Sequence, residues 1–306
     1  MAGVRIDGER LVFNGGLALR LEITLRVPND GRTYPLPPSL GAFPMYRTVD
    51  YEATRQVAGR GAFFVPLYQW EAMWMSFDAE DWRPKAVQVA AGGVNVLTGE
   101  RFPSKLRAKP QNYLVCPTQP WLDGIRTEGG TVRQFVAAPL GQGLTLEEQI
   151  TGEAAKGGLQ VRVISGKEGI FPTRRPKGFS LAALYSESVF AGDMGFAAGG
   201  AIEQKVYPDP HGLRVWDPES SQDVSILIVN SAEFHAMTGH APPQSPITAE
   251  QYDRYGLPWF ELYDEPRGDI GSAATLQKLK TVAVKGDRAT ARRVVKIRPA
   301  SRPGRK

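Results

Sequence analysis

Turn-forming residues break the apolar segments of this chain into short pieces, which limits the elements that it can form. The 306 residues include 33 glycines and 24 prolines. In the representative segment Leu17–Val27, leucine and isoleucine alternate with small or polar residues. This period of two is typical of a strand with one buried and one solvated face. The chain is therefore expected to build its core mainly from short strands.

Glycine-rich turns predict three hairpins. Strands are expected on both sides of Asn14–Gly16, and Gly92-Gly93 is expected to join residues 86–90 to residues 94–97. A third turn at residues 127–130 would join 122–126 to 131–137. The spacing of Trp70 and Trp74 fits a helix or a strand equally well, because positions i and i+4 share a face in both.

Two capping sequences predict helices. Thr145 and Glu148 form a capping box, so a helix should run from there to about Ala155 and be followed by a strand at 159–164. Asn230 should open a second short helix that ends at Gly239 and follows an apolar strand at 224–229.

Because strands outnumber helices, we predict an α+β protein that is β-rich, with a predominantly antiparallel sheet and a few short helices. Residues 1–275 would form one body, with a possible internal boundary in the proline- and arginine-containing loop 166–178. Residues 276–306 lose the apolar periodicity and are rich in charge, so they are expected to be a disordered basic tail.

Charge is segregated along the chain. Residues 278–306 hold eleven Lys and Arg against one Asp, a net charge of +10, whereas the rest holds 26 basic and 31 acidic residues, a net charge of −5. Such a tail could make weak, non-specific contacts with nucleic-acid phosphates, an anionic membrane surface or an acidic protein. The plain alternative is a solvated tail without a dedicated partner. The candidate polyanion-binding residues are Lys285, Arg288, Arg292, Arg293, Lys296 and Arg298.

Localisation is inferred from what the sequence lacks. It has no apolar run of about 20 residues, the length needed to cross a bilayer, and no apolar stretch at its start of the kind found in signal peptides. The single Cys116 cannot form an internal disulfide. A cytoplasmic protein is therefore expected; its oligomeric state is left open.

Several phrases spread over the body resemble a bacterial protein family with no established activity. The resemblance implies a shared fold and says little about chemistry. The phrases are Tyr68–Trp74 (YQWEAMW), Gln119–Gly124 (QPWLDG), Arg133–Gly141 (RQFVAAPLG), Tyr207–Asp217 (YPDPHGLRVWD) and Leu257–Asp264 (LPWFELYD).

Acidic residues near tryptophans supply the most suggestive candidate site. Glu71 and Asp123 could form a carboxylate pair for acid/base chemistry, as in glycoside hydrolysis. Trp74, Trp121 and Arg133 would then bind a polar ligand, with the rings providing contact area and the arginine fixing orientation. The plain alternative is that the tryptophans belong to the core and the charged residues lie in turns.

Metal and nucleophile motifs are weak. The histidines have no zinc-ligand spacing, and no cofactor is predicted. Asp209, His211 and Asp217 form one local group that could hold a divalent ion, although such residues beside proline and glycine usually belong to turns. Cys116 follows an apolar run and is expected to be a buried apolar residue.

Two functions follow as hypotheses. The favoured one is a non-catalytic binding or structural protein whose basic tail contacts polyanions or an acidic partner. The alternative is a carboxylate-dependent hydrolase with a tryptophan-lined pocket. The positions of two residues distinguish these hypotheses, because the hydrolase requires Glu71 and Asp123 to meet in an open cleft.

Overall fold

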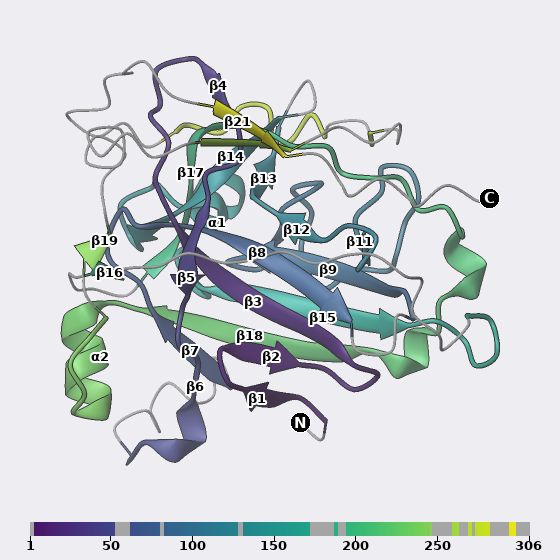
Figure 1. Ribbon diagram of the computed structural model, residues 1–306, viewed down its shortest axis with the longest axis horizontal. Helices are drawn as coiled ribbons and strands as arrows, with labels where there is room; N and C mark the ends of the chain where they lie inside the picture. The colour runs from purple at the N-terminus through teal and green to yellow at the C-terminus, as the bar shows by residue number, and fades with distance from the viewer. Residues whose placement is uncertain are drawn as a thin grey trace.

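Strands dominate the fold (Figure 1). The computed structural model describes residues 3–52, 62–79, 83–127, 131–171, 187–188, 194–243, 245–246, 259–262, 269–270, 273–281 and 294–297. Within these ranges the α-helices are α1 (Leu146–Thr151) and α2 (Ser231–Thr238), and single 3-10 turns lie at η1 (Thr48–Asp50), η3 (Leu213–Val215) and η4 (Pro218–Ser220). The strands are β1 (Arg5–Asp7), β2 (Arg10–Val12), β3 (Leu17–Thr24), β4 (Thr33–Tyr34), β5 (Ser39–Ala42), β6 (Tyr46–Arg47), β7 (Phe63–Pro66), β8 (Ala72–Ala79), β9 (Lys85–Ala91), β10 (Val94–Asn95), β11 (Leu114–Cys116), β12 (Trp121–Leu122), β13 (Gly124–Arg126), β14 (Thr131–Pro139), β15 (Leu159–Ser165), β16 (Glu187–Ser188), β17 (Met194–Glu203), β18 (Gln222–Val229), β19 (Ser245–Pro246), β20 (Trp259–Leu262) and β21 (Val294–Ile297).

Most of these strands belong to one continuous sheet. Its long strands follow the order β3–β8–β14–β17–β18–β15–β9, and each of these neighbouring pairs is antiparallel. Short strands extend it, and two of them, β4 on β17 and β7 on β18, pair in parallel. The predicted strand-rich fold with a predominantly antiparallel sheet is therefore confirmed, with parallel additions that the sequence did not reveal.

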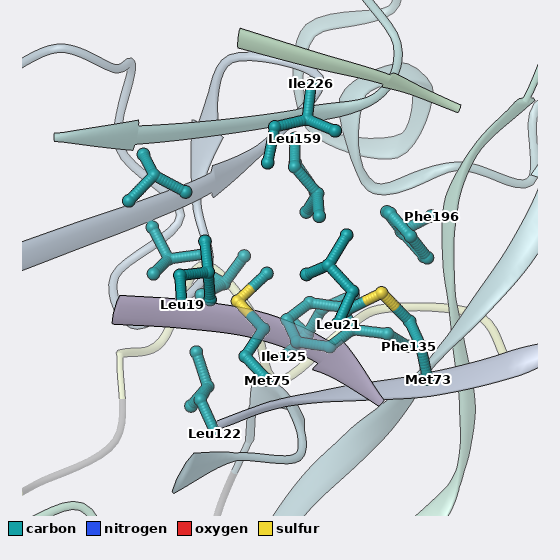
Figure 2. Packing of buried hydrophobic residues seen from close by; sticks show 14 of the residues in the cluster. Leu19, Leu21, Met73, Met75, Leu122, Ile125, Phe135, Leu159, Phe196 and Ile226 are labelled. Atoms are coloured by element: carbon teal, nitrogen blue, oxygen red, sulfur yellow. The ribbon is translucent and has the colours of Figure 1, made fainter. Parts of the chain in front are cut away.

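The long strands enclose a single main core. Side chains from β3 and β8 meet side chains from β15 and β18, and Figure 2 shows them pointing toward one another. Because strands far apart in the sheet order contribute to one cluster, the sheet must curve back on itself so that one of its faces becomes the interior. Residues from these four strands include Leu19, Leu21, Met73, Met75, Leu159 and Ile226.

The predicted hairpins are all present. β2 pairs with β3, and the turn closes where the Phe13 amide donates to the Leu17 carbonyl (2.8 Å). β9 pairs with β10 through Gly92 and Gly93, whose φ angles of 57° and 78° are left-handed, a conformation that favours glycine. β13 pairs with β14. The ambiguous tryptophan segment is a strand, β8, preceded by a turn in which Trp70 has a φ of 71°.

Helix starts are confirmed, but one predicted helix end is wrong. Thr145 and Glu148 form both hydrogen bonds of the capping box. The helix α1 then stops at the left-handed Gly152 rather than near Ala155. The buried carboxylate of Glu147 explains the early end, because it accepts hydrogen bonds from the amides of residues 155, 156 and 157 and so organises them as a loop. In α2 the Glu233 amide donates to the Asn230 side chain (3.1 Å), as a cap requires.

The solvated face predicted for the segment 17–27 is wrong. In β3 the alternate positions Glu22 and Thr24 are as buried as their apolar neighbours. The proline-rich connector explains this, because the Thr24 hydroxyl donates to the Pro38 carbonyl (2.8 Å) and the Ser39 hydroxyl donates to Glu22 (2.8 Å). Both faces of β3 are therefore covered.

Described residues beyond the expected body boundary at residue 275 also contact the body. Leu276 is fully buried in the main core, and Thr281 forms a β-bridge with Ala198 on β17. Of the predicted disordered tail, residues 294–297 form β21, which pairs in parallel with β20, and the rest beyond Thr281 lies outside the described residues.

The proposed internal boundary at 166–178 is described only to residue 171, and that part is tied to the body because Gly166 bridges Trp216. None of the described helices is both long and apolar enough to span a membrane.

Candidate functional site

The structure brings the two candidate carboxylate residues to one edge of β14. The Ala137 amide donates to the Glu71 carbonyl (2.8 Å), and the Phe135 amide donates to the Asp123 carbonyl (3.4 Å). The two donors are two residues apart, which corresponds to roughly 7 Å along a strand. Glu71 and Asp123 are therefore backbone neighbours, although 51 positions of sequence separate them.

Glu71 is closed off from solvent in the turn that leads into β8. It is 4% exposed, and its carboxylate accepts a hydrogen bond from the Tyr68 amide (2.7 Å). Burial raises the pKa of Glu71 to about 8, and the hydrogen bond from Tyr68 lowers it by less. At neutral pH this carboxyl group is therefore mostly protonated.

Asp123 lies where the chain steps from one strand to another. β12 pairs with β8, but β13, which begins one residue after Asp123, pairs with β14. The Asp123 amide donates to the Gln204 side chain (2.9 Å). Asp123 is fully buried, and neither carboxyl oxygen has a hydrogen-bond partner of normal geometry among the described residues.

The electrostatic surroundings of Asp123 favour its neutral form. Burial raises the pKa of this carboxyl group well above its ordinary value, and the side chain of Trp121 offsets this only in part. An ionised carboxylate without hydrogen bonds would be very costly in such a place. The protonated form is therefore the one that the fold accommodates.

Buried polar side chains from β3, from β8 and from the step between β12 and β13 lie in register at this point. Glu22 on β3 is the cross-strand partner of Trp74 on β8. Trp121 pairs with Ser76, so continuing that antiparallel register by two residues places Asp123 beside Trp74. We call Glu22, Trp74 and Asp123 the polar row.

The members of the polar row differ in how well they are satisfied. Glu22 accepts hydrogen bonds from the hydroxyls of Ser76 (2.5 Å) and Ser39 (2.8 Å). The indole nitrogen of Trp74 is buried and, like the Asp123 oxygens, has no partner within the described part of the chain. Buried polar groups without partners are rare and are commonly satisfied by ordered water or a ligand.

Trp121 and Arg133 border this site, and neither makes a hydrogen bond of normal geometry to its carboxylates within the described residues. Trp121 is half-buried on β12. Arg133 lies at a register shift in β14, and its guanidinium reaches the Asn29 side chain at 3.5 Å. Burial lowers the pKa of Arg133. No hydrogen bond or ion pair joins Arg133 to Asp123 or Glu71 in the described structure.

Sequence reasoning missed several residues of this site. Gln134 on β14 donates to the Leu25 carbonyl (2.7 Å) and accepts from the Val27 amide (2.9 Å), so it links β14 to the end of β3. The Gln204 side chain also donates to the Trp121 carbonyl (3.2 Å). One sequence signal of this site was available. A glycine inside a strand often marks the close approach of another backbone, and Gly124 directly follows Asp123. A Cβ at Gly124 would collide with the Arg133 carbonyl.

The weak metal candidates serve a structural purpose. The Asp209 carboxylate accepts from the Tyr113 hydroxyl (2.5 Å), the Trp216 indole (3.0 Å) and the His211 amide (2.7 Å). Asp217 caps η4 by accepting from the Glu219 amide (3.2 Å). No group of three or more potential metal ligands occurs among the described residues. The three candidates therefore do not converge.

Two predictions remain: the buried Cys116 and the polyanion-binding residues of the tail. Cys116 is fully buried, and burial raises the pKa of its thiol well above the ordinary value, which disfavours the reactive thiolate. Lys296 belongs to β21. The other predicted polyanion-binding residues lie outside the described ranges: Lys285, Arg288, Arg292, Arg293 and Arg298.

Comparison with known proteins returned no match among protein-family models, curated proteins or solved structures. The function of this chain has to be inferred from its residues.

Proposed function

We propose that this protein is a non-catalytic binding protein whose basic C-terminal segment contacts polyanions. The observation that carries the proposal is the attachment of the segment that leads into the basic residues. Leu276 is buried in the main core, and the Lys280 amide donates to the Gln149 side chain (2.6 Å). The chain beyond Thr281 therefore starts from a fixed point on the body.

An ion pair between a buried arginine and a partly exposed aspartate adds to this attachment. The guanidinium of Arg126 on β13 is 1% exposed and bonds to the Asp269 carboxylate (2.6 Å) and to the Ile270 carbonyl. The Val206 amide donates to the other Asp269 oxygen (2.9 Å). These contacts join Asp269 and Ile270 to β13 and to Val206.

The net charge beyond this anchor suits a polyanion. Residues 282–306 contain nine Lys and Arg and one Asp, whereas the body is net negative. Contacts with nucleic-acid phosphates release counterions, so binding should be weak, independent of sequence and steeply dependent on salt. The acidic body would oppose close approach and weaken binding further.

The hydrolase remains the second candidate because Glu71 and Asp123 lie side by side along β14 and both have raised pKa values. Perturbed carboxyl groups of this kind are common in active sites. However, an inverting or a retaining glycosidase must admit a sugar and a water molecule between its carboxylates. With exposures of 4% and 0%, these two side chains offer no such access.

A salt titration tests the favoured proposal. A labelled random-sequence duplex is titrated with the native chain and with a full-length variant carrying Lys285→Gln, Arg288→Gln, Arg292→Gln and Arg293→Gln. We expect the native chain to bind at low salt with a steep dependence. The variant should bind more weakly with a slope reduced by up to about 3.6, since each of the four lost phosphate contacts contributes about 0.9.

The matched control is Arg5→Gln, which removes one exposed positive charge from β1 on the body. It should bind like the native chain. If the variant with four substitutions binds as tightly as the native chain, or if binding does not change with salt, the tail is ruled out as the contact.

A further inference from the structure

A second, smaller core lies beside the main one and supports three loops. It contains buried residues of β9, β11 and β15 together with Trp216, and Leu106, Phe171 and Val215 pack against it from the loops. The loops span residues 104–112, 166–171 and 208–217. We call their outer surface the loop face; in Figure 1 it lies at the right, around the ends of β15 and β11.

Hydrogen bonds join the three loops into one surface. The Asp209 amide donates to the Gln111 side chain (2.8 Å), which ties the third loop to the first. The Lys167 amide donates to the Val215 carbonyl (2.8 Å), which ties the second loop to the third. The Asp209 carboxylate then holds Tyr113 and Trp216, as described above. The groups that the loops expose therefore have defined relative positions.

The loop face exposes aliphatic side chains. Ile170 is 50% exposed and Leu213 is 41% exposed, and these are two of the three large apolar side chains that are so exposed in the described part of the chain. A single exposed apolar residue is ordinary. Here the two residues stand on loops that hydrogen bonds join together. Phe171, the residue after Ile170, packs against the ring of His211, two residues before Leu213, with 4.9 Å between the ring centroids.

The same surface is positively charged. Lys105 and Lys109 on the first loop, Lys167 on the second and Arg214 on the third are all exposed. None of these four forms an ion pair with any described residue, and Glu168 is the exposed acid on these loops. A cationic face on a body whose net charge is negative attracts acidic groups and repels basic ones.

We infer that the loop face is a docking surface for an acidic, aliphatic peptide segment of a partner protein. Charge complementarity selects acidic residues, and Ile170 and Leu213 provide apolar contacts on the same loops as the basic groups. Nucleic acid fits less well, because single-stranded bases need aromatic platforms. On the three described loops the one exposed ring, His211, is already packed on Phe171. The inference rests on body residues and is independent of the basic tail.

Fluorescence anisotropy with the full-length protein tests it. The probe is a short fluorescein-labelled peptide in which Glu and Leu alternate, compared with the same peptide carrying Ser in place of Leu. One variant combines Ile170→Ser and Leu213→Ser, and the other combines Lys167→Glu and Arg214→Glu. The matched controls are Val49→Ser, which removes the most exposed large apolar side chain among the described residues (74%), and Arg5→Glu on β1.

We expect the native protein to prefer the Glu/Leu peptide over the Glu/Ser peptide. Each double variant should weaken binding of the Glu/Leu peptide by about tenfold or more, because it removes either the apolar contacts or the charge attraction. Both controls should bind it like the native protein. The variant with four tail substitutions should do the same once binding of the Glu/Ser peptide is subtracted.

Three results would overturn the inference. If neither double variant changes peptide binding, or if only the variant with four tail substitutions does, the peptide binds elsewhere; the proposal for the tail would be unaffected. If the loop variants weaken binding of a random DNA duplex instead, the face recognises nucleic acid. If they change the protein's own association in sedimentation experiments and leave peptide affinity unchanged, a second copy of the chain covers this face.

Discussion

The native protein should become less stable as the pH rises, because the buried Glu71 must ionise. Replacing Glu71 with glutamine should make stability depend less on pH. The carboxyl group of Glu71 has a pKa of about 8 in the folded chain, against an ordinary value of 4.5. Between these values the folded state binds the proton and the unfolded state does not. The protonated group therefore contributes fully to stability below about pH 4.5, and this contribution is lost as the pH rises toward 8.

The size of this effect follows from the gap between the two pKa values. The gap is about 3.5 units, and each unit corresponds to about 1.4 kcal/mol, so the limit is about 5 kcal/mol. Relaxation around the charged group reduces such values, and we expect a measured loss of about 2–4 kcal/mol. Asp123 acts in the same direction, because burial raises its pKa as well.

Urea unfolding at a series of pH values from about 5 to about 9 measures the effect. The native chain should become less stable across this range, and Glu71→Gln should flatten the curve, because the amide keeps the size of the side chain and can still accept from the Tyr68 amide. Glu203→Gln, at an exposed position of β17, is the control and should follow the native curve. If Glu71→Gln shows the same pH dependence as the native protein, our reasoning about the buried carboxyl group is wrong.

Three further substitutions test the packing. Leu276→Ala should cost about 2–5 kcal/mol in urea unfolding because this side chain is fully buried; native-like stability would restore the earlier boundary near residue 275. Trp74→Ala should cost about 3–5 kcal/mol, and Trp121→Ala clearly less because that ring is only half-buried; equal costs would contradict the difference in burial. Thr145→Ala should cost about 1 kcal/mol and speed hydrogen exchange in α1, and unchanged exchange would show that the cap is dispensable.

The local elements were largely predictable because their determinants are close in sequence. The turn at Gly92 and Gly93 needs left-handed backbone, and the start of α1 needs the contact between Thr145 and Glu148, which are three residues apart. The end of α1 was not predictable in the same way. It depends on Glu147 reaching amides eight to ten residues further along the chain, and no local pattern announces that contact.

The candidate site illustrates the limits more sharply. Glu71 and Asp123 were selected for residue type and for the tryptophans around them, and β14 does bring their backbones together. Their burial was not foreseen. Likewise, the alternation in β3 indicated a strand correctly but predicted solvent around Glu22, which instead bonds to Ser39 and Ser76.

The sequence by itself determined the strand-rich character, the hairpins and helix starts, and the separation of a basic end from an acidic body. These properties depend on neighbouring residues or on composition alone. Tertiary structure decided which faces are covered, where the body ends and which polar groups are left without partners. Those outcomes depend on contacts between segments far apart in the chain, such as Arg126 with Asp269 and Gln134 with Leu25. Burial, and with it the pKa of a carboxyl group, is a property of the assembled sheet.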